Sequence, residues 1–148
     1  SKKFEFLVCK ADGARAKLIK CPNDDEPIIP TSCDLVVPIV SIKALGEKLT
    51  SRIAHRVDKL CELWRESSGC LITKEHIVSL MISKNGFLKN ADEYKILPLI
   101  NMADSSKELE DATEIAEMAL ETTDRFDKVV IGSMLKGNIK KVVCRKST

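Results

Sequence analysis

The chain has 148 residues, 44% hydrophobic and 31% charged, a balance typical of a folded globular domain rather than a disordered or collagen-like chain. Its net charge of +2 and aromatic content of 4% give little reason to expect nucleic acid as a partner. No apolar stretch reaches the ~20 residues of a membrane helix, and no signal-peptide pattern opens the chain, so we expect a cytoplasmic protein without a membrane partner.

Five apolar runs predict the strands of a sheet. Residues 4–9 and 35–40 are rich in Val, Ile and Phe and lack polar alternation, which is typical of parallel strands covered on both faces. Residues 96–100 and 129–131 have the same character. Residues 139–144 contain two lysines, which predicts an edge strand at the end of the sheet.

Three amphipathic patterns predict helices between these strands. In residues 56–66 the apolar side chains recur at helical spacing, and residues 76–82 follow Thr73, a candidate N-cap. The clearest helix spans residues 105–122 and opens with a capping box that begins at Ser105. These helices are long enough to serve as the crossovers between parallel strands.

Strands that alternate with helices predict an α/β fold, with a mostly parallel sheet flanked by helices in a single domain over residues 1–148. Ligands bind such sheets beyond the carboxyl ends of the strands. Three predicted strands end in polar or small residues, at Asp12 and Gly13, at residues 101–104 (NMAD), and at Gly132 and Ser133. Two bland alternatives stay open: the Asp-Gly pair can form an ordinary turn, and the NMAD aspartate can simply precede a helix.

The six cysteines form no C-x-x-C pair, and the two histidines lie far apart in the sequence. Zinc and redox sites normally show closely spaced ligands, so we expect reduced cysteines, several of them in the core, and no zinc.

The order of elements around NMAD resembles the base-recognition end of P-loop GTPases, where an N-K-x-D motif precedes a helix, a strand and a small-residue motif. An aspartate there can accept two N–H bonds from a guanine edge while the asparagine braces the loop. Here Met102 replaces the lysine of that motif, which removes its packing against the base.

Beyond this local likeness, nearly the whole chain resembles the YqeC family, accessory proteins of selenium-dependent molybdenum hydroxylases. The resemblance rests on several unusual strings in the same order. They are ADGAR (11–15), the K-x-P of residues 20–22, EPIIP (26–30), VVPIVSIKALGEKL (36–49), HR (55–56), ITKEHI (72–77), NMAD (101–104) and VVIGS (129–133).

The resemblance implies the C-terminal part of a P-loop NTPase fold, with Mg²⁺ and ATP or GTP as cofactors. It places Asp12 near the metal, and it implies contact with the nucleotide for Gly13, Asn101, Asp104, Gly132 and Ser133. Family members begin with a Gly-rich phosphate loop, and no G-x-x-x-x-G-K-[ST] string occurs here. We therefore expect a fragment that lacks the N-terminal P-loop strands. Lys10 also departs from the acidic residue that precedes Ala-Asp-Gly in the family.

The long polar segment Lys10–Pro30 leaves the tip of the first predicted strand. On the family interpretation Arg15 and Lys20 face phosphate or the acidic surface of a partner, and we expect the same of His55 and Arg56. The alternatives are that KLIK and EPIIP form short edge pieces, and that the histidine satisfies a polar group in the core.

Two functions follow from the resemblance. The first is an accessory or maturation protein for a selenium-dependent molybdenum hydroxylase, which binds nucleotide when its P-loop segment is present and is at most an NTP hydrolase in the full-length protein. The second is a non-enzymatic module that binds the apo-hydroxylase or its pterin cofactor. In both cases the expected partners are the molybdenum hydroxylase or the proteins that handle its cofactor, and this chain alone is expected not to be an enzyme.

Overall fold

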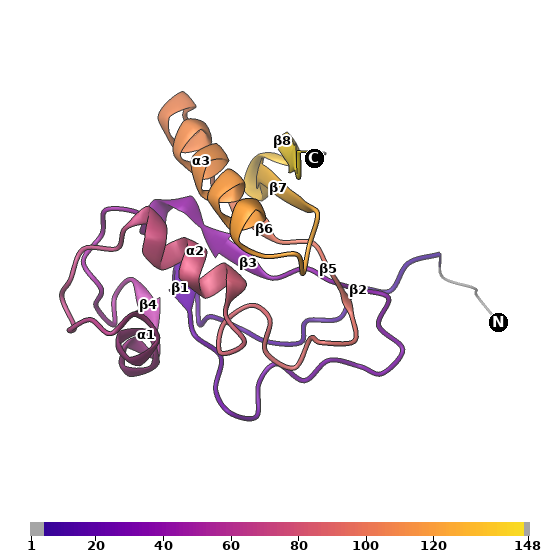
Figure 1. The fold of residues 1–148 in the computed structure, drawn as a ribbon, viewed down its shortest axis with the longest axis horizontal. Coiled ribbons are helices and arrows are strands. Elements are labelled where there is room, and N and C mark those ends of the chain that lie inside the picture. Colours follow the sequence, from indigo (N-terminus) through magenta and orange to yellow (C-terminus); the bar gives the residue numbers. More distant parts are fainter. Residues whose placement is uncertain (1–4, 147–148) are drawn as a thin grey trace.

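The computed structural model describes residues 5–146 and confirms an α/β architecture with mostly parallel strands (Figure 1). Its strands and helices follow in chain order. They are β1 (Ile19–Lys20), β2 (Leu35–Val36), β3 (Ile39–Ser41), η1 (Ile42–Ala44), β4 (Ala54–His55), α1 (Val57–Trp64), α2 (Lys74–Ile82), β5 (Lys95–Ile96), β6 (Leu99–Asn101), α3 (Ser106–Thr122), β7 (Lys128–Ser133), η2 (Met134–Lys136) and β8 (Asn138–Cys144).

Two prolines divide the predicted central strands. Residues 35–40 become β2 and β3 on either side of Pro38, and residues 96–100 become β5 and β6 on either side of Pro98. A proline has no backbone N–H to donate, so it interrupts a ladder without ending the path of the chain. Backbone hydrogen bonds from Leu97 N to Val36 O and from Leu99 N to Pro38 O carry the pairing across both breaks.

The largest sheet has the strand order β3-β6-β7-β8, in which the first three strands are parallel and β8 is antiparallel to β7. The predicted edge strand 139–144 is confirmed as β8, and a bulge opposite Gly132 interrupts its register. The parallel pair β1–β4 is connected to this sheet by a hydrogen bond from Ser41 N to Leu18 O.

The prediction of a strand over residues 4–9 is wrong for the described residues 5–9, which have no strand pairing. Residue 4 lies outside the described part of the chain. The side chains of Phe6, Leu7 and Val8 are 84–94% exposed, and no strand of residues 5–146 pairs with this segment. An apolar run becomes a buried strand only when a neighbouring strand and a covering layer are present, and here it has neither.

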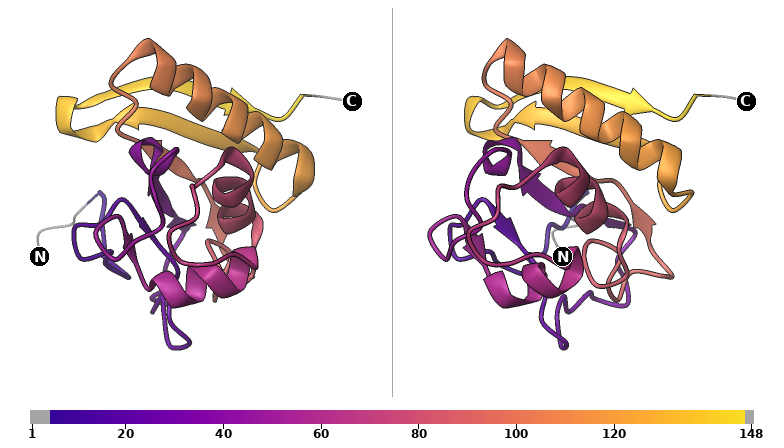
Figure 2. Two further views of the ribbon diagram at one scale, coloured as in Figure 1. Left: turned by 90° about the vertical axis from the view of Figure 1, so that its left-hand side faces the viewer. Right: turned by 60° about the vertical axis from the view of Figure 1, so that its left-hand side comes forward.

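The three predicted helices are confirmed as α1, α2 and α3. The Thr73 side chain caps α2, and Ser105 and Glu108 form the predicted capping box at the start of α3. Helix α2 packs against α3, and α3 packs against β7 and β8, as Figure 2 shows for α3. Their apolar faces join the core, whose fully buried members include Ile77, Ile100 and Ile115.

Candidate functional site

The Lys10–Pro30 segment is held to the β4–α1 junction by ion pairs. Parallel pairing of β1 with β4 sets Lys20 beside His55. The Lys20 ammonium pairs with the Asp12 carboxylate, and its Nζ lies 2.6 Å from Glu26 Oε2. Glu26 also accepts two hydrogen bonds from the Arg56 guanidinium, at 2.6 and 2.8 Å. The sequence strings ADG, K-x-P, EPIIP and HR therefore meet in one network.

The charges of this network are strongly coupled. The bidentate Arg56 guanidinium, with Lys20, holds the pKa of the Glu26 carboxyl far below its usual range, so Glu26 is ionised at any ordinary pH. The pKa of His55 is lowered, first by burial and then by the cations of Arg56, Arg15 and Lys20. The imidazole is therefore neutral at pH 7, although Glu26 partly offsets the effect of the cations.

Three of the six non-glycine residues with positive φ in the described part of the chain lie beside the same cations. Arg15 and Ala16 have φ values of 51° and 59°, in a tight turn closed by a hydrogen bond from Lys17 N to Ala14 O. Arg56 has a φ of 62° where it precedes α1. Residues with a Cβ rarely adopt this left-handed conformation, and such strain is found more often at functional sites than elsewhere. The turn leaves the Arg15 side chain exposed, and no ion pair within residues 5–146 involves it.

A second group of predicted residues meets where β3, β6 and β7 end. The Ser133 hydroxyl donates to Asp104 Oδ1 at 2.7 Å, and Lys43 Nζ lies 2.7 Å from Asp104 Oδ2. These contacts lower the pKa of Asp104 to about 2, with Lys43 as the first cause. Asn101 Oδ1 accepts from the backbone N–H groups of Met102 and Met134 at 2.8 and 2.9 Å, so this asparagine braces the loop as predicted.

The glycines and Ser133 have structural contacts of their own. A Cβ at Gly132 would lie 2.7 Å from Met134 Cε and 3.0 Å from Asn138 O, so this glycine lets β8 approach β7 closely. Ser133 is 1% exposed, so its hydroxyl supports Asp104 from inside the protein. Gly13 donates its N–H to Asp12 at 2.6 Å, which shapes the turn after that carboxylate.

The predicted residues thus form two networks, one around Asp12 and one around Asp104. No hydrogen bond or ion pair in the described part of the chain joins them. Asp12, the predicted ligand of Mg²⁺, is occupied by the ammonium of Lys20, and within residues 5–146 no three His, Cys, Asp or Glu side chains converge. The described residues therefore do not fit a resident Mg²⁺, which needs several free oxygen ligands.

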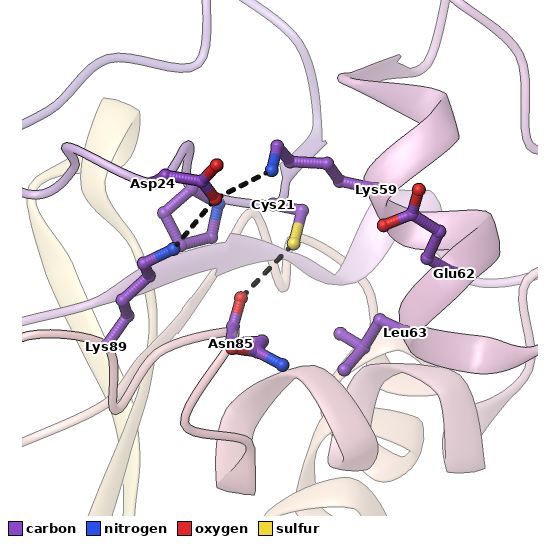
Figure 3. Close-up of a pocket in the computed structure, with 8 residues that line it drawn as sticks. Cys21, Asp24, Lys59, Glu62, Leu63, Asn85 and Lys89 are labelled. Carbon is purple, nitrogen blue, oxygen red and sulfur yellow. Dashed lines mark hydrogen bonds and ion pairs between the residues drawn. The ribbon is translucent and has the colours of Figure 1, made fainter.

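A pocket that the sequence did not predict is lined in part by Cys21 and Pro22 of the K-x-P string (Figure 3). It has a volume of about 210 Å³, and Asp24 at its edge pairs with Lys59 at 2.9 Å and Lys89 at 3.5 Å. Cys21 lies inside, with its thiol 3.2 Å from Asn85 O. Burial raises the pKa of this thiol, so it stays protonated and is a poor nucleophile or metal ligand.

This pocket could not be found from the sequence because its lining comes from three separate segments. Cys21 and Asp24 belong to the polar segment, Lys59 to α1, and Asn85 and Lys89 to the turns after α2. None of these residues forms a recognisable spacing, so only the fold brings them together.

Fold and site together define an α/β protein with a cationic, internally ion-paired cluster beside the β1–β4 pair. Comparison with known proteins finds a family that part of the chain resembles. The model of the YqeC protein family matches residues 1–58, which contain the whole Asp12–Arg56 network, so the predicted resemblance to this family is confirmed over that part of the chain. The strings ITKEHI, NMAD and VVIGS lie outside the matched residues.

The chain is also similar to the "Uncharacterized protein YqeC" of Escherichia coli (strain K12), with 25% identity over 89 residues. This alignment covers 60% of the chain and 35% of the relative, so the chain corresponds to about a third of that protein's length. No solved structure matches, so the likeness to P-loop NTPases stays a prediction. Within residues 5–146 no helix combines the length and apolarity needed to cross a membrane.

Proposed function

We propose that this chain is a binding part of an accessory protein that matures a selenium-dependent molybdenum hydroxylase, and that it recognises an anionic group at Arg15, Lys20, His55 and Arg56. The anion is a phosphate of a nucleotide or of the pterin cofactor of the hydroxylase. One observation carries the proposal: left-handed backbone at Arg15, Ala16 and Arg56 occurs at or beside cations that lower the pKa of His55.

The arrangement favours binding over catalysis. Asp12 and Asp104, the carboxylates with predicted metal and base contacts, are each paired with a lysine. His55 is neutral and lies among cations, so it can donate to an anionic oxygen or gain a proton when an anion arrives. Arg15 has a guanidinium free to form a bidentate contact with phosphate.

Nucleotide binding with Mg²⁺ stays a proposal for a longer protein that carries a phosphate-binding loop. There the Asp12–Lys20 network would lie at the phosphates and the Asp104 network at the base. The second candidate, a module that contacts the apo-hydroxylase without nucleotide, is favoured by the tight pairing of both carboxylates. Both candidates use the same cationic cluster, so one experiment can test whether this cluster binds an anion.

The test is a ¹H–¹³C NMR titration of the two histidine rings with pyrophosphate, and separately with GTP, ATP and a pterin phosphate. An anion offsets the neighbouring cations, so binding should raise the pKa of His55, whereas the ring signals of His76, stacked on Trp64 at 4.6 Å, should not move on adding the anion. Arg15→Ala should weaken binding about tenfold, which is ~1.4 kcal/mol for one charge-assisted contact.

Arg52→Ala is the matched control, because Arg52 is an exposed arginine of the same region and lies outside the network. It should leave the affinity unchanged. Arg15→Ala removes no ion pair of the described residues, so we expect the variant to fold like the wild type. If none of the four anions shifts the His55 signals at millimolar concentration, the proposed anion site is wrong.

A further inference from the structure

The two faces of the largest sheet have different surroundings. Residues that lie opposite one another in neighbouring strands point to the same face of the sheet. Val40, Ile100 and Ile131 form one row across β3, β6 and β7, and they are 0–1% exposed beneath the helices. The next row belongs to the opposite face, because successive residues of a strand alternate between faces.

That opposite row consists of Ile39, Leu99, Val130 and Val142, which are registered across all four strands. Ile39 is 58% exposed and Val142 is 46% exposed. Leu99, in the middle of the row, is buried at 7% but is not part of the core cluster that the helices cover. The row is therefore apolar, continuous and separate from the core.

The apolar surface extends toward the start of the strands. Leu35 and Val37 share the alternation of Ile39 and are 45% and 43% exposed. We call this surface, made of Leu35, Val37, Ile39, Leu99, Val130 and Val142, the bare sheet face. Parallel strands are normally covered on both faces, and α2 and α3, which pack against each other, lie on the other one.

Two lysines share this face at its strand-start end. Lys95 alternates with Leu97 and Leu99 on the β5–β6 path, and Lys128 alternates with Val130 on β7. Both are exposed, and neither forms an ion pair within residues 5–146. The bare sheet face thus combines an apolar stripe with a cationic end.

We propose that the bare sheet face docks an amphipathic helix of a partner protein whose apolar stripe is flanked by Asp or Glu. A helix is the usual cover of a parallel sheet, and its apolar stripe would bury the exposed rows. Acidic flanks complement Lys95 and Lys128, whereas a second copy of this chain would bring lysines of the same face against the sheet. The proposal does not depend on the anion site.

The experiment uses two synthetic helical peptides of about 18 residues, five turns, with the same leucine stripe and either Glu or Lys flanks. Fluorescence anisotropy against the 148-residue chain should show at least tenfold tighter binding of the Glu peptide. The double reversal Lys95→Glu with Lys128→Glu should invert this preference. Ile39→Asp should abolish binding of both peptides, because it buries an unpaired charge in the interface.

Leu135→Asp is the matched control, since Leu135 is 95% exposed and lies in η2, outside the bare sheet face. It should change neither affinity, and far-UV circular dichroism should be the same for all variants. Equal binding of the two peptides, or no inversion by the lysine reversal, would overturn the proposal. Light scattering tests a further outcome. If the chain is a dimer and Ile39→Asp dissociates it, the bare sheet face binds a second copy of the chain, and the proposal is wrong.

Discussion

Glu26 is the residue on which the candidate anion site depends most. It joins Arg56 at the start of α1 to Lys20 in β1, and through Lys20 it is linked to Asp12. Its side chain is only 25% exposed, so its charge is partly withdrawn from water and relies on these partners. A neutral residue of the same shape would leave two cations close together without their shared counter-ion.

Glu26→Gln should destabilise the protein by about 1–3 kcal/mol at pH 7, the range for losing hydrogen bonds to a charged group. The folded pKa of Glu26 lies below its ordinary value of 4.5, so its contribution is complete above that pH and is lost as the pH falls toward the folded value. The free energy of unfolding, measured in urea between pH 7 and pH 2, should therefore fall less with pH in the variant than in the wild type.

Asp25→Asn provides the control for this pH dependence, because Asp25 is the exposed neighbour and forms none of these ion pairs. Its stability curve should follow that of the wild type. A Glu26→Gln variant that keeps the full acid-induced loss would mean that other carboxyl groups, such as Asp104, produce it.

Among the helices and strands, the sequence predicted those features that residues close together in the chain determine. The caps at Thr73 and Ser105 were predicted because each depends on contacts within a few residues, and β8 was predicted from its own apolar run and two lysines. β1 and β4 have two residues each and pair with one another; a short strand in KLIK was only an alternative, and no local pattern indicated β4 or the pairing. The candidate site depends on that pairing, and its ion pairs were therefore not predictable.

The start of α3 offers the clearest test of whether nearby residues determine where a helix begins. Ser105 Oγ accepts from Glu108 N, and the Glu108 carboxylate accepts from the backbone N–H groups of Ser105 and Asp104. Ser105→Ala should cost about 1 kcal/mol, the usual value for a lost N-cap, measured by urea unfolding. Ser106→Ala, the same change one residue later, removes no side-chain hydrogen bond of the described residues and should cost far less.

Equal effects at the two serines would contradict the capping assignment. The Asp104 loop gives a second readout, because Glu108 also binds Asp104 N. In the Ser105→Ala variant we expect faster hydrogen exchange at the amides of residues 104–108, while β7 keeps its protection.

The whole molecule is expected to unfold as one unit, although its sheet is divided into short pieces. The core cluster runs without interruption from Ile19 in β1, through Trp64 in α1 and Ile100 in β6, to Val143 in β8. Removing side-chain volume at one end should therefore destabilise the other end as well. This expectation corresponds to the single domain predicted for the chain. The fluorescence of a tryptophan can test it.

Trp64 is the sole tryptophan and reports on α1, whereas the far-UV circular dichroism signal is dominated by α3, the longest helix of the described residues. In urea the two signals should change with the same midpoint, in the wild type and in Ile100→Ala, whose buried side chain predicts a loss of about 2–5 kcal/mol. Ile139→Ala, at a side chain that is 63% exposed, should shift the midpoint much less. If Ile100→Ala moves only the dichroism transition, the β1–β4–α1 region folds independently of the main sheet, and the anion site belongs to a separate unit.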